Sequence, residues 1–240
     1  FEMVLQPKMD LKTNSVIAAE ALVRWRLEDG TYLPPSSFVD IFEKNRFCSK
    51  LDFYMLKKAI QQIRKWIDMG MNPVNISVNQ SKIVFYHENY ISEIKSLLEE
   101  YNVSGSYITL EVLESTVIED IDMFNSILTE VKKLGFSVSL DDFGSGYSSL
   151  NVLSKLQIDE LKIDRIFLHT KSEVDNQRTK WILESIIDIA KKSQILVVVE
   201  GVESKQDDLF IKNLGADIGQ GYFYGRPLSI SAFNDLIETK

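Results

Sequence analysis

Oxygen-bearing side chains recur inside or directly after the short apolar segments of this 240-residue sequence. They are Glu20, Asn75, Glu111, Asp141, Asp142, Glu200 and Gln220, and one lysine, Lys162, lies in the same kind of segment. Carboxylate and amide oxygens are hard ligands that suit Mg²⁺ or Mn²⁺. The adjacent acids Asp141 and Asp142 suit a two-metal arrangement, because one carboxylate can bridge ions about 3.5–4 Å apart. The chemistry that such a metal pair serves best is in-line attack of a hydroxide on a phosphodiester.

Each of these acids also has a simpler explanation when it is taken alone. An acid that follows a strand can cap the next helix or face solvent in a loop. The six carboxylate and asparagine positions together are not explained in that way. Several carboxylates on one apolar scaffold repel one another, so the group requires protonation or a cation.

The elements that must position these side chains alternate along the chain. Two strands, Phe1–Gln6 and Val16–Trp25, are predicted to form an antiparallel pair around a polar turn. Further strands are predicted at Val74–Val78, Tyr107–Val112, Phe136–Leu140, Glu160–Ile163, Ile195–Val199 and Asp217–Gly219. Helices are predicted at 34–43, Leu51–Met69, Tyr90–Tyr101, Ile121–Leu134, Ser149–Leu156, Asn176–Lys192, Lys205–Leu214 and Ser231–Glu238. This alternation implies an α/β fold with a parallel sheet, and about eight strands favour a closed barrel whose strand ends converge on one catalytic rim.

Composition limits the classes of protein that this chain can represent. Hydrophobic residues make up 45% and charged residues 26%, which is typical of globular chains. The net charge of −8 disfavours binding of duplex nucleic acid, but it leaves room for a small phosphate ester bridged by metal ions. A single cysteine, Cys48, excludes an intrachain disulfide and favours a reducing compartment.

Targeting and domain signals are sparse. No apolar run approaches the roughly 20 residues of a membrane span, and no signal peptide is visible. The chain begins at Phe1 without an initiator methionine. We expect residues 1–240 to form one domain that has been excised from a larger protein.

The same residues lie in motifs that resemble those of the EAL-domain cyclic-di-GMP phosphodiesterases. In the order of that family the motifs are Gln6-Pro7, Glu20-Ala21-Leu22-Val23-Arg24-Trp25, Asn75-Ile76-Ser77, Glu111-Val112-Leu113-Glu114, Asp141-Asp142-Phe143-Gly144-Ser145-Gly146-Tyr147-Ser148-Ser149-Leu150, Leu161-Lys162-Ile163-Asp164, Glu200-Gly201-Val202-Glu203 and Gln220-Gly221-Tyr222. The motifs cover the chain from end to end, which is far more specific than Glu-Ala-Leu alone. The resemblance implies a TIM-like (β/α)8 barrel whose first strand is antiparallel. It also implies metal-dependent hydrolysis of cyclic di-GMP to linear pGpG.

The resemblance implies a role for each matched residue. The metal ligands would be Glu20, Asn75, Glu111, Asp141, Asp142 and Glu200 around two Mg²⁺ or Mn²⁺ ions; the catalytic residues would be Lys162, Glu200 and Gln220; and Glu114 and Glu203 would support the Asp-Phe-Gly loop and the outer metal shell. Asp141 would be shared between the ions, and Lys162 would orient the nucleophilic water and lower its pKa. Arg24 would meet a substrate phosphate, while Gln6 and Pro227 would border a guanine.

The sequence departs from the family pattern at a few positions. Leu5 replaces a common tyrosine, Leu113 a common threonine, and Asn79 stands where many members carry arginine. Asn75 and Glu111 are 36 positions apart (111 − 75), a few more than the family pattern predicts. These departures concern substrate affinity and loop positioning more than the chemistry.

Three functions remain open at this stage. The chain could hydrolyse cyclic di-GMP, bind it as a receptor without cleavage, or serve as a protein-interaction domain in which the acids are relics. The complete ligand set favours the enzyme, because receptors of this family usually lack one or more ligands. The resemblance further implies a bacterial cytoplasmic location, a homodimer, and a parent protein with upstream sensory or GGDEF-type domains that could attach it to a membrane.

Overall fold

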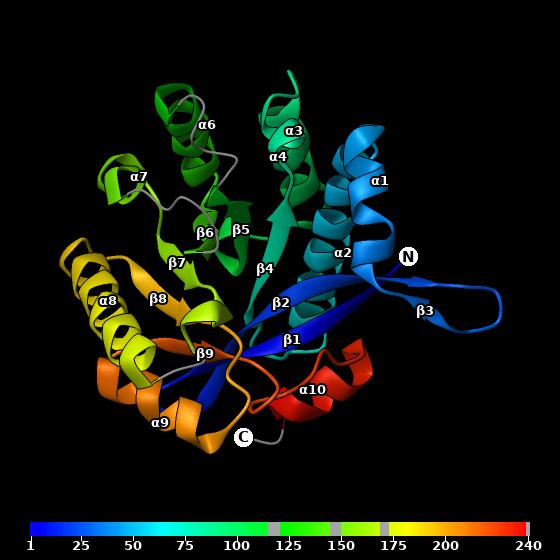
Figure 1. Cartoon of the computed structure of the whole chain (residues 1–240). Coiled ribbons are helices and arrows are strands. Elements are labelled where there is room, and N and C mark those ends of the chain that lie inside the picture. The colour runs from blue at the N-terminus through cyan, green and yellow to red at the C-terminus, as the bar shows by residue number, and fades with distance from the viewer. Residues whose placement is uncertain (115–120, 145–149, 169–172, 239–240) are drawn as a thin grey trace.

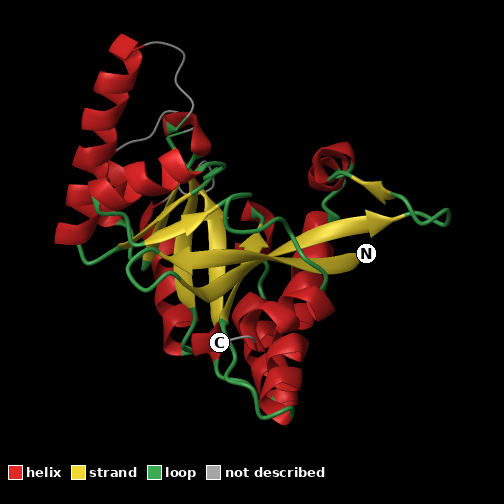
Figure 2. Ribbon diagram, turned by 90° about the horizontal axis from the view of Figure 1, so that it is seen from below, coloured by secondary structure: helices red, strands yellow, loops and turns green. Residues whose placement is uncertain are grey.

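Short strands form the wall of a closed barrel, and helices surround it (Figures 1 and 2). The computed structural model describes residues 1–114, 121–144, 150–168 and 173–238, so residues 145–149 of the longest motif lie outside the described residues. The strands are β1 Glu2–Asp10, β2 Ser15–Arg26, β3 Tyr32–Leu33, β4 Asn75–Gln80, β5 Ile108–Leu113, β6 Ser137–Phe143, β7 Glu160–Ile163, β8 Leu196–Val199 and β9 Ile218–Gln220. The α-helices are α1 Val39–Lys44, α2 Cys48–Asp68, α3 Lys82–Phe85, α4 Tyr90–Tyr101, α6 Ile121–Lys133, α7 Leu150–Lys155, α8 Glu173–Lys192, α9 Lys205–Leu214 and α10 Ile230–Glu238. Short 3₁₀ helices occupy η1 Pro35–Ser37, η2 Gly105–Tyr107 and η3 Arg165–Phe167.

The order of the strands closes the barrel. The wall runs β1-β9-β8-β7-β6-β5-β4-β2, and β2 pairs back with β1, while β3 pairs with β2 outside the wall. Strand β1 is antiparallel to both of its neighbours. The other pairs in the wall are parallel. The predicted α/β barrel with an antiparallel first strand is therefore confirmed.

The apolar core lies between the wall and the helices. In β8 the run Val197–Val199 is buried, as is typical of parallel strands that are covered on both faces. Helix α2 turns Leu56, Ile60 and Ile63 toward the wall, and their spacing of three and four residues places them on one helix face. None of the described helices is long and apolar enough to cross a bilayer.

The strands differ from the sequence prediction more than the helices do. Helices α4 and α9 have the predicted bounds, whereas β1 continues past Gln6 to Asp10 and β6 continues past Leu140 to Phe143. The reason is that polar side chains line the inside of this barrel, so an apolar run underestimates the length of a strand. Strand β3 and helix α3 had no counterpart in the prediction.

Helix α2 is tied to the C-terminal helix through one tryptophan. Trp66 is fully buried, its ring lies 6.1 Å from the ring of Phe233, and its Nε1 donates to Asn234 Oδ1 at 2.7 Å. Residues 66 and 234 belong to α2 and α10, so this contact joins distant parts of the chain beneath the barrel wall.

Substitution Trp66→Ala removes both the buried ring and the hydrogen bond, so we expect a loss of about 3–5 kcal/mol in the free energy of unfolding. Urea denaturation followed by circular dichroism measures this loss. Trp181→Ala is the matched control, because Trp181 lies 58% exposed on α8. Equal effects of the two substitutions would contradict the packing described.

Candidate active site

Acidic side chains converge at the open end of the barrel, where the parallel strands end. Glu20 comes from β2, Glu111 from β5, and Glu200 directly follows β8. A cavity of about 390 Å³ opens over this end, and its lining includes Glu20, Asp141, Asp142, Lys162, Glu200 and Gln220. The structure thus brings these six predicted site residues together with Gln6 and Glu203 in one hollow, and Glu111 reaches the same group from below through Lys162.

The ammonium group of Lys162 lies at the centre of the acids. Its Nζ is 2.7 Å from Glu200 Oε1, 2.9 Å from Asp141 Oδ1 and 3.0 Å from Glu111 Oε2. It also lies 3.4 Å from Glu20 Oε2, and the lysine side chain is 1% exposed. Burial alone would lower the pKa of Lys162, but the surrounding carboxylates outweigh burial and raise that pKa well above its ordinary value. The surrounding acids therefore favour the ammonium form of this lysine.

One lysine does not balance the acids around it. Burial and the neighbouring acids raise the pKa of Glu20 and of Asp141. Burial raises the pKa of Glu200 to about 8. The pKa of Glu111 shifts in the opposite direction. The ammonium groups of Lys162 and Lys8 overcome the effect of burial and lower this pKa to about 2. A group of carboxylates that resists ionisation in this way is stabilised by a cation.

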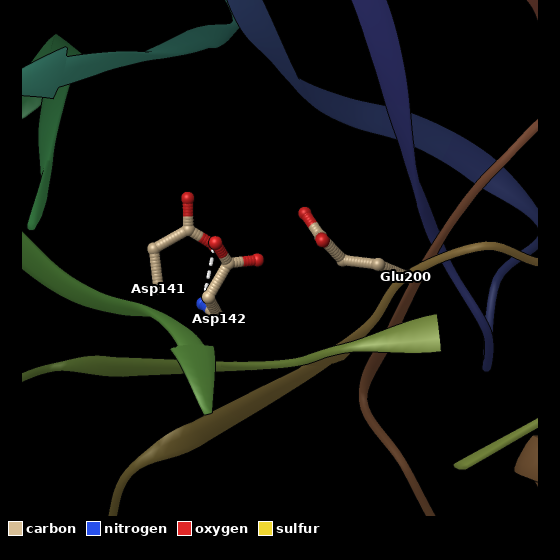
Figure 3. A group of neighbouring side chains, drawn as sticks. All are labelled: Asp141, Asp142 and Glu200. Atoms are coloured by element: carbon tan, nitrogen blue, oxygen red, sulfur yellow. Dashed lines mark hydrogen bonds between the residues drawn. The ribbon is translucent and has the colours of Figure 1, made fainter. Parts of the chain in front are cut away.

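Two consecutive aspartates face the cavity because β6 is irregular at this point. Successive side chains of a regular strand point to opposite faces. The pairing of β6 with β7 shifts between Leu140 and Phe143, and Asp142 adopts a left-handed φ of 57°. The backbone N–H of Asp142 donates to Asp141 Oδ1 at 2.9 Å. Figure 3 shows both aspartates turned toward Glu200, and one oxygen of each of the three lies within 4.8 Å of the others.

The donor set fits a divalent metal ion. Gln220 donates from Nε2 to Glu20 Oε2 at 2.6 Å, but its Oε1 is buried without a hydrogen-bond partner among the described residues. A buried oxygen without a partner costs free energy, which a water molecule or a cation removes. The oxygens of Asp141, Asp142 and Glu200 supply the hard ligands that Mg²⁺ and Mn²⁺ prefer.

The structure places a different asparagine at this site from the one that the sequence predicts. Asn75 lies at the beginning of β4, where Nδ2 donates to Ser106 O at 3.2 Å and Oδ1 accepts from Thr109 Oγ1 at 2.9 Å. Asn79 lies four residues further along the same strand and donates to Glu20 Oε1 at 2.9 Å. At roughly 3.3 Å per residue, four residues separate the two side chains by about 13 Å along one strand face. The structure therefore places Asn79, and not Asn75, beside Glu20, and we propose below that Asn79 takes the ligand role predicted for Asn75.

The sequence contains a signal that supports Asn79. Asn79-Gln80-Ser81 repeats the Asn-x-Ser pattern of Asn75-Ile76-Ser77. Measured from Asn79, the distance to Glu111 falls to 32 positions (111 − 79), which removes the excess length noted above. With the same shift of alignment, Asn79 no longer stands at the position of the arginine, which moves to Ile83 (79 + 4).

The predicted substrate contacts lie around the rim. Gln6 lines the cavity and donates from Nε2 to Gly225 O at 3.3 Å. Pro227 is held near Gln6 by two backbone hydrogen bonds of the adjacent residues. Leu228 N–H donates to Leu5 O at 2.8 Å, and Leu5 N–H donates to Leu228 O at 2.9 Å. Arg24 lies further out on β2, four residues beyond Glu20, and donates to Val23 O at 2.9 Å.

The two predicted supporting glutamates occupy different environments. Glu114 is 5% exposed directly after β5. Glu203 is exposed, lines the cavity, and donates its backbone N–H to Asp207 Oδ2 at 3.1 Å in the cap of α9.

A second lysine, Lys8, and its partner Glu160 were not predicted as site residues. Lys8 nevertheless donates to Glu111 Oε1 at 2.8 Å.

Comparison with known proteins assigns the chain to a family. The family model described as EAL domain matches residues 1–227, and the chain belongs to this family. The chain is 33% identical over 223 residues to the bifunctional diguanylate cyclase/cyclic di-GMP phosphodiesterase MucR of Pseudomonas aeruginosa, covering 93% of this chain and 32% of MucR. It is 31% identical to the cyclic di-GMP phosphodiesterase PdeR of Escherichia coli K12, covering 95% of this chain and 34% of PdeR. The chain thus spans about a third of the length of the curated relatives it matches.

Solved structures share the fold. The structure described as PaMucR phosphodiesterase in complex with c-di-GMP superposes with a TM-score of 0.88 at 32% identity, and the match covers 96% of this chain and 93% of that one. The Bd1971 EAL enzyme in its cAMP- and cyclic-di-GMP-bound form superposes with a TM-score of 0.90 at 29% identity over 98% of this chain and 64% of that one.

Substitution Asn79→Ala removes an amide that contacts Glu20, so we expect the affinity for Mn²⁺ to fall on the order of tenfold or more. Isothermal titration calorimetry on metal-stripped protein measures this affinity without substrate. Asn75→Ala is the matched control and should bind Mn²⁺ like the parent chain, with only the stability change of about 1 kcal/mol that the loss of local hydrogen bonds causes. The reverse ranking of the two variants would restore Asn75 to the metal site.

Proposed function

We propose that this domain hydrolyses cyclic di-GMP to linear pGpG in a reaction that depends on Mg²⁺ or Mn²⁺. The observation that carries the proposal is the complete group of carboxylates gathered around the buried ammonium group of Lys162 at the mouth of an EAL-family barrel. The relatives named as cyclic di-GMP phosphodiesterases and the related structure with c-di-GMP bound support the same substrate.

Metal ions would be held by two groups of ligands that share one carboxylate. The first group is Glu20, Asn79, Glu111 and Asp141, and the second is Asp141, Asp142 and Glu200. Bound metal ions supply a Lewis acid for the phosphodiester and a hydroxide at neutral pH. The separation of Asp141 and Asp142 by one peptide bond, together with the bulge in β6, supports a shared ligand at this position.

The protein groups around the metal ligands orient the attack. Lys162 stays protonated, so its ammonium group donates hydrogen bonds and stabilises the negative charge that develops on the nucleophile and the phosphate. Glu200 is the most exposed of the four acids that contact Lys162, at 21%. It therefore lies on the side from which water enters. Gln220 holds Glu20 through Nε2, and its Oε1, which has no hydrogen-bond partner among the described residues, would be free to accept from a water molecule in the site.

The rim supports recognition of a dinucleotide. The guanidinium group of Arg24 suits a phosphate oxygen pair, and Gln6 with Pro227 forms an edge for one base. A second cavity of about 250 Å³ is lined in part by Asn79, and its walls also include Leu22, Pro35 and Met55. Its apolar walls and the carboxylate of Asp52 suit the second purine base, because a carboxylate accepts from the N–H groups at the edge of guanine.

Incubation of the purified domain with cyclic di-GMP and Mn²⁺ should yield pGpG, and omission of divalent metal should abolish the product. Liquid chromatography with mass detection distinguishes pGpG from substrate and from GMP. Binding of cyclic di-GMP by calorimetry without any turnover at high enzyme concentration would instead identify a receptor. Failure to bind the nucleotide would identify a protein-interaction domain.

Substitution Lys162→Met removes the central ammonium group, so we expect kcat to fall by about 10²-fold or more, as for loss of one electrostatic contact in a water-excluded site. Steady-state kinetics at saturating Mn²⁺ measures the loss. Lys65→Met replaces an exposed lysine on α2 and is the matched control. Turnover by Lys162→Met at the rate of the control would remove Lys162 from the mechanism.

The remaining expectations from the sequence concern the surroundings of the domain. A homodimer, upstream sensory or GGDEF-type domains and a cytoplasmic location stay predictions. The multidomain relative MucR is consistent with the second of these.

A further inference from the structure

A second lysine lies deeper in the barrel than Lys162 and is completely buried. Lys8 Nζ donates to Ser77 Oγ at 2.7 Å, to Glu111 Oε1 at 2.8 Å and to Glu160 Oε1 at 2.9 Å. An ammonium group has three donors, so each N–H of Lys8 has one acceptor. The side chain is 0% exposed, and its partners come from β4, β5 and β7.

The direction of β1 explains how a lysine reaches this depth. Residues two apart on a strand share a face, so Lys8 points into the barrel like Gln6, which lines the cavity at the mouth. Because β1 is antiparallel to its neighbours, moving forward along it leads away from the mouth. Ser77 and Glu160 likewise lie two residues before Asn79 and Lys162 on parallel strands, which places them one layer below the acids.

Glu111 is the link between the two layers. Its Oε1 accepts from Lys8 and its Oε2 accepts from Lys162 at 3.0 Å. The last torsion angle of a glutamate side chain has a broad and roughly twofold distribution. An unrestrained carboxylate can therefore rotate and exchange the positions of its two oxygens. With Oε1 bonded to Lys8, the carboxylate plane is fixed and Oε2 alone is directed at the site.

We propose that Lys8 is a positioning residue for the metal site: it holds Glu111 so that Oε2 faces the metal ligands, and Glu160 balances its charge. The proposal deepens the metal-dependent function proposed above and rests on it. Stability alone does not explain Lys8, because a buried ion pair is often replaced by apolar groups without loss of stability. The pair of Lys8 and Glu160 carries no net charge, so it offers a cation at the site little electrostatic benefit.

This balance gives the test its direction. Removal of Lys8 and Glu160 together leaves the net charge beneath the site unchanged, so metal binding should stay almost the same if charge alone matters. Loss of a group that orients a ligand should weaken it, typically by about 10-fold to 100-fold. The double variant Lys8→Met/Glu160→Gln removes the lysine together with its counter-charge, so no unpaired ion is left inside the barrel. The single variant Glu160→Gln keeps the contact between Lys8 and Glu111 and is the matched control.

Calorimetric titration of Mn²⁺ into metal-stripped protein, without nucleotide, separates this proposal from the proposed reaction. The double variant should bind Mn²⁺ about 10-fold to 100-fold more weakly than the parent chain, and the loss in Glu160→Gln, which keeps the contact between Lys8 and Glu111, should be smaller. Near-ultraviolet circular dichroism confirms that each variant is folded. A smaller loss in the double variant, tighter binding, or an equal loss in Glu160→Gln overturns the proposal, whether or not the parent chain hydrolyses cyclic di-GMP.

A measurement on the unaltered protein keeps the proposal testable if the double variant does not fold. The buried ammonium group of Lys8 is protected from solvent exchange, so its ¹⁵N resonance can be followed in lysine-labelled protein during titration with Mg²⁺. The resonance should shift in step with occupancy of the metal site, because Glu111 is shared. An ammonium resonance that stays unchanged at saturating Mg²⁺ overturns the proposal.

Discussion

Charge balance inside the barrel is the constraint on which the rest of this site depends. Five buried or nearly buried carboxylates share the interior with two ammonium groups: Glu20, Glu111, Asp141, Glu160 and Glu200 with Lys8 and Lys162. Ions removed from water are tolerated only when each is paired and hydrogen-bonded. Lys8 is fully paired, but the acids at the mouth outnumber Lys162. The remaining excess of negative charge is what a divalent cation can neutralise, so the need for charge balance and the proposed chemistry have the same origin.

The wall of the barrel separates the charged side chains inside it from the apolar core that stabilises the fold. Apolar side chains of the wall and of helices such as α2 form the core outside the strands. The interior can then carry charge without weakening the packing that holds the strands together. The bulge in β6 belongs to the same division, because it occurs at the mouth of the barrel and turns a second aspartate inward where β6 leaves the wall.

The sequence predicts the barrel and most of the acids because both leave local signals. Alternating apolar and helical segments define β7, α4 and α9 to the residue, and the glutamates and aspartates follow recognisable motifs. The strand pattern alone does not separate Asn75 from Asn79, because residues four apart share a strand face and both are followed by serine two positions later. The spacing to Glu111 favours Asn79, and the register of β4 against β5, in which Asn79 lies opposite Glu111, supports the same choice.

The place of Lys8 inside the barrel is not predicted from the sequence for a related reason. A lysine in a strand near the N-terminus usually faces solvent, and nothing in its local sequence shows that β1 has its polar face inside a barrel. Its partners lie 69, 103 and 152 positions away along the chain. Contacts of such separation depend on topology, and single-sequence patterns of period two or 3.6 carry no information on them.

The closure of the barrel by β1 also sets the order in which this site can form. Lys8 pairs with Gln220 across β1 and β9, a separation of 212 positions (220 − 8), so the first strand finds its second neighbour only when almost the whole chain is present. Pairing over such a distance requires a costly loop closure and is slow. Gln220 can therefore reach Glu20 and complete the site only after β9 has been synthesised. The charge cluster at the mouth is thus completed by the strand of the barrel that comes last in chain order.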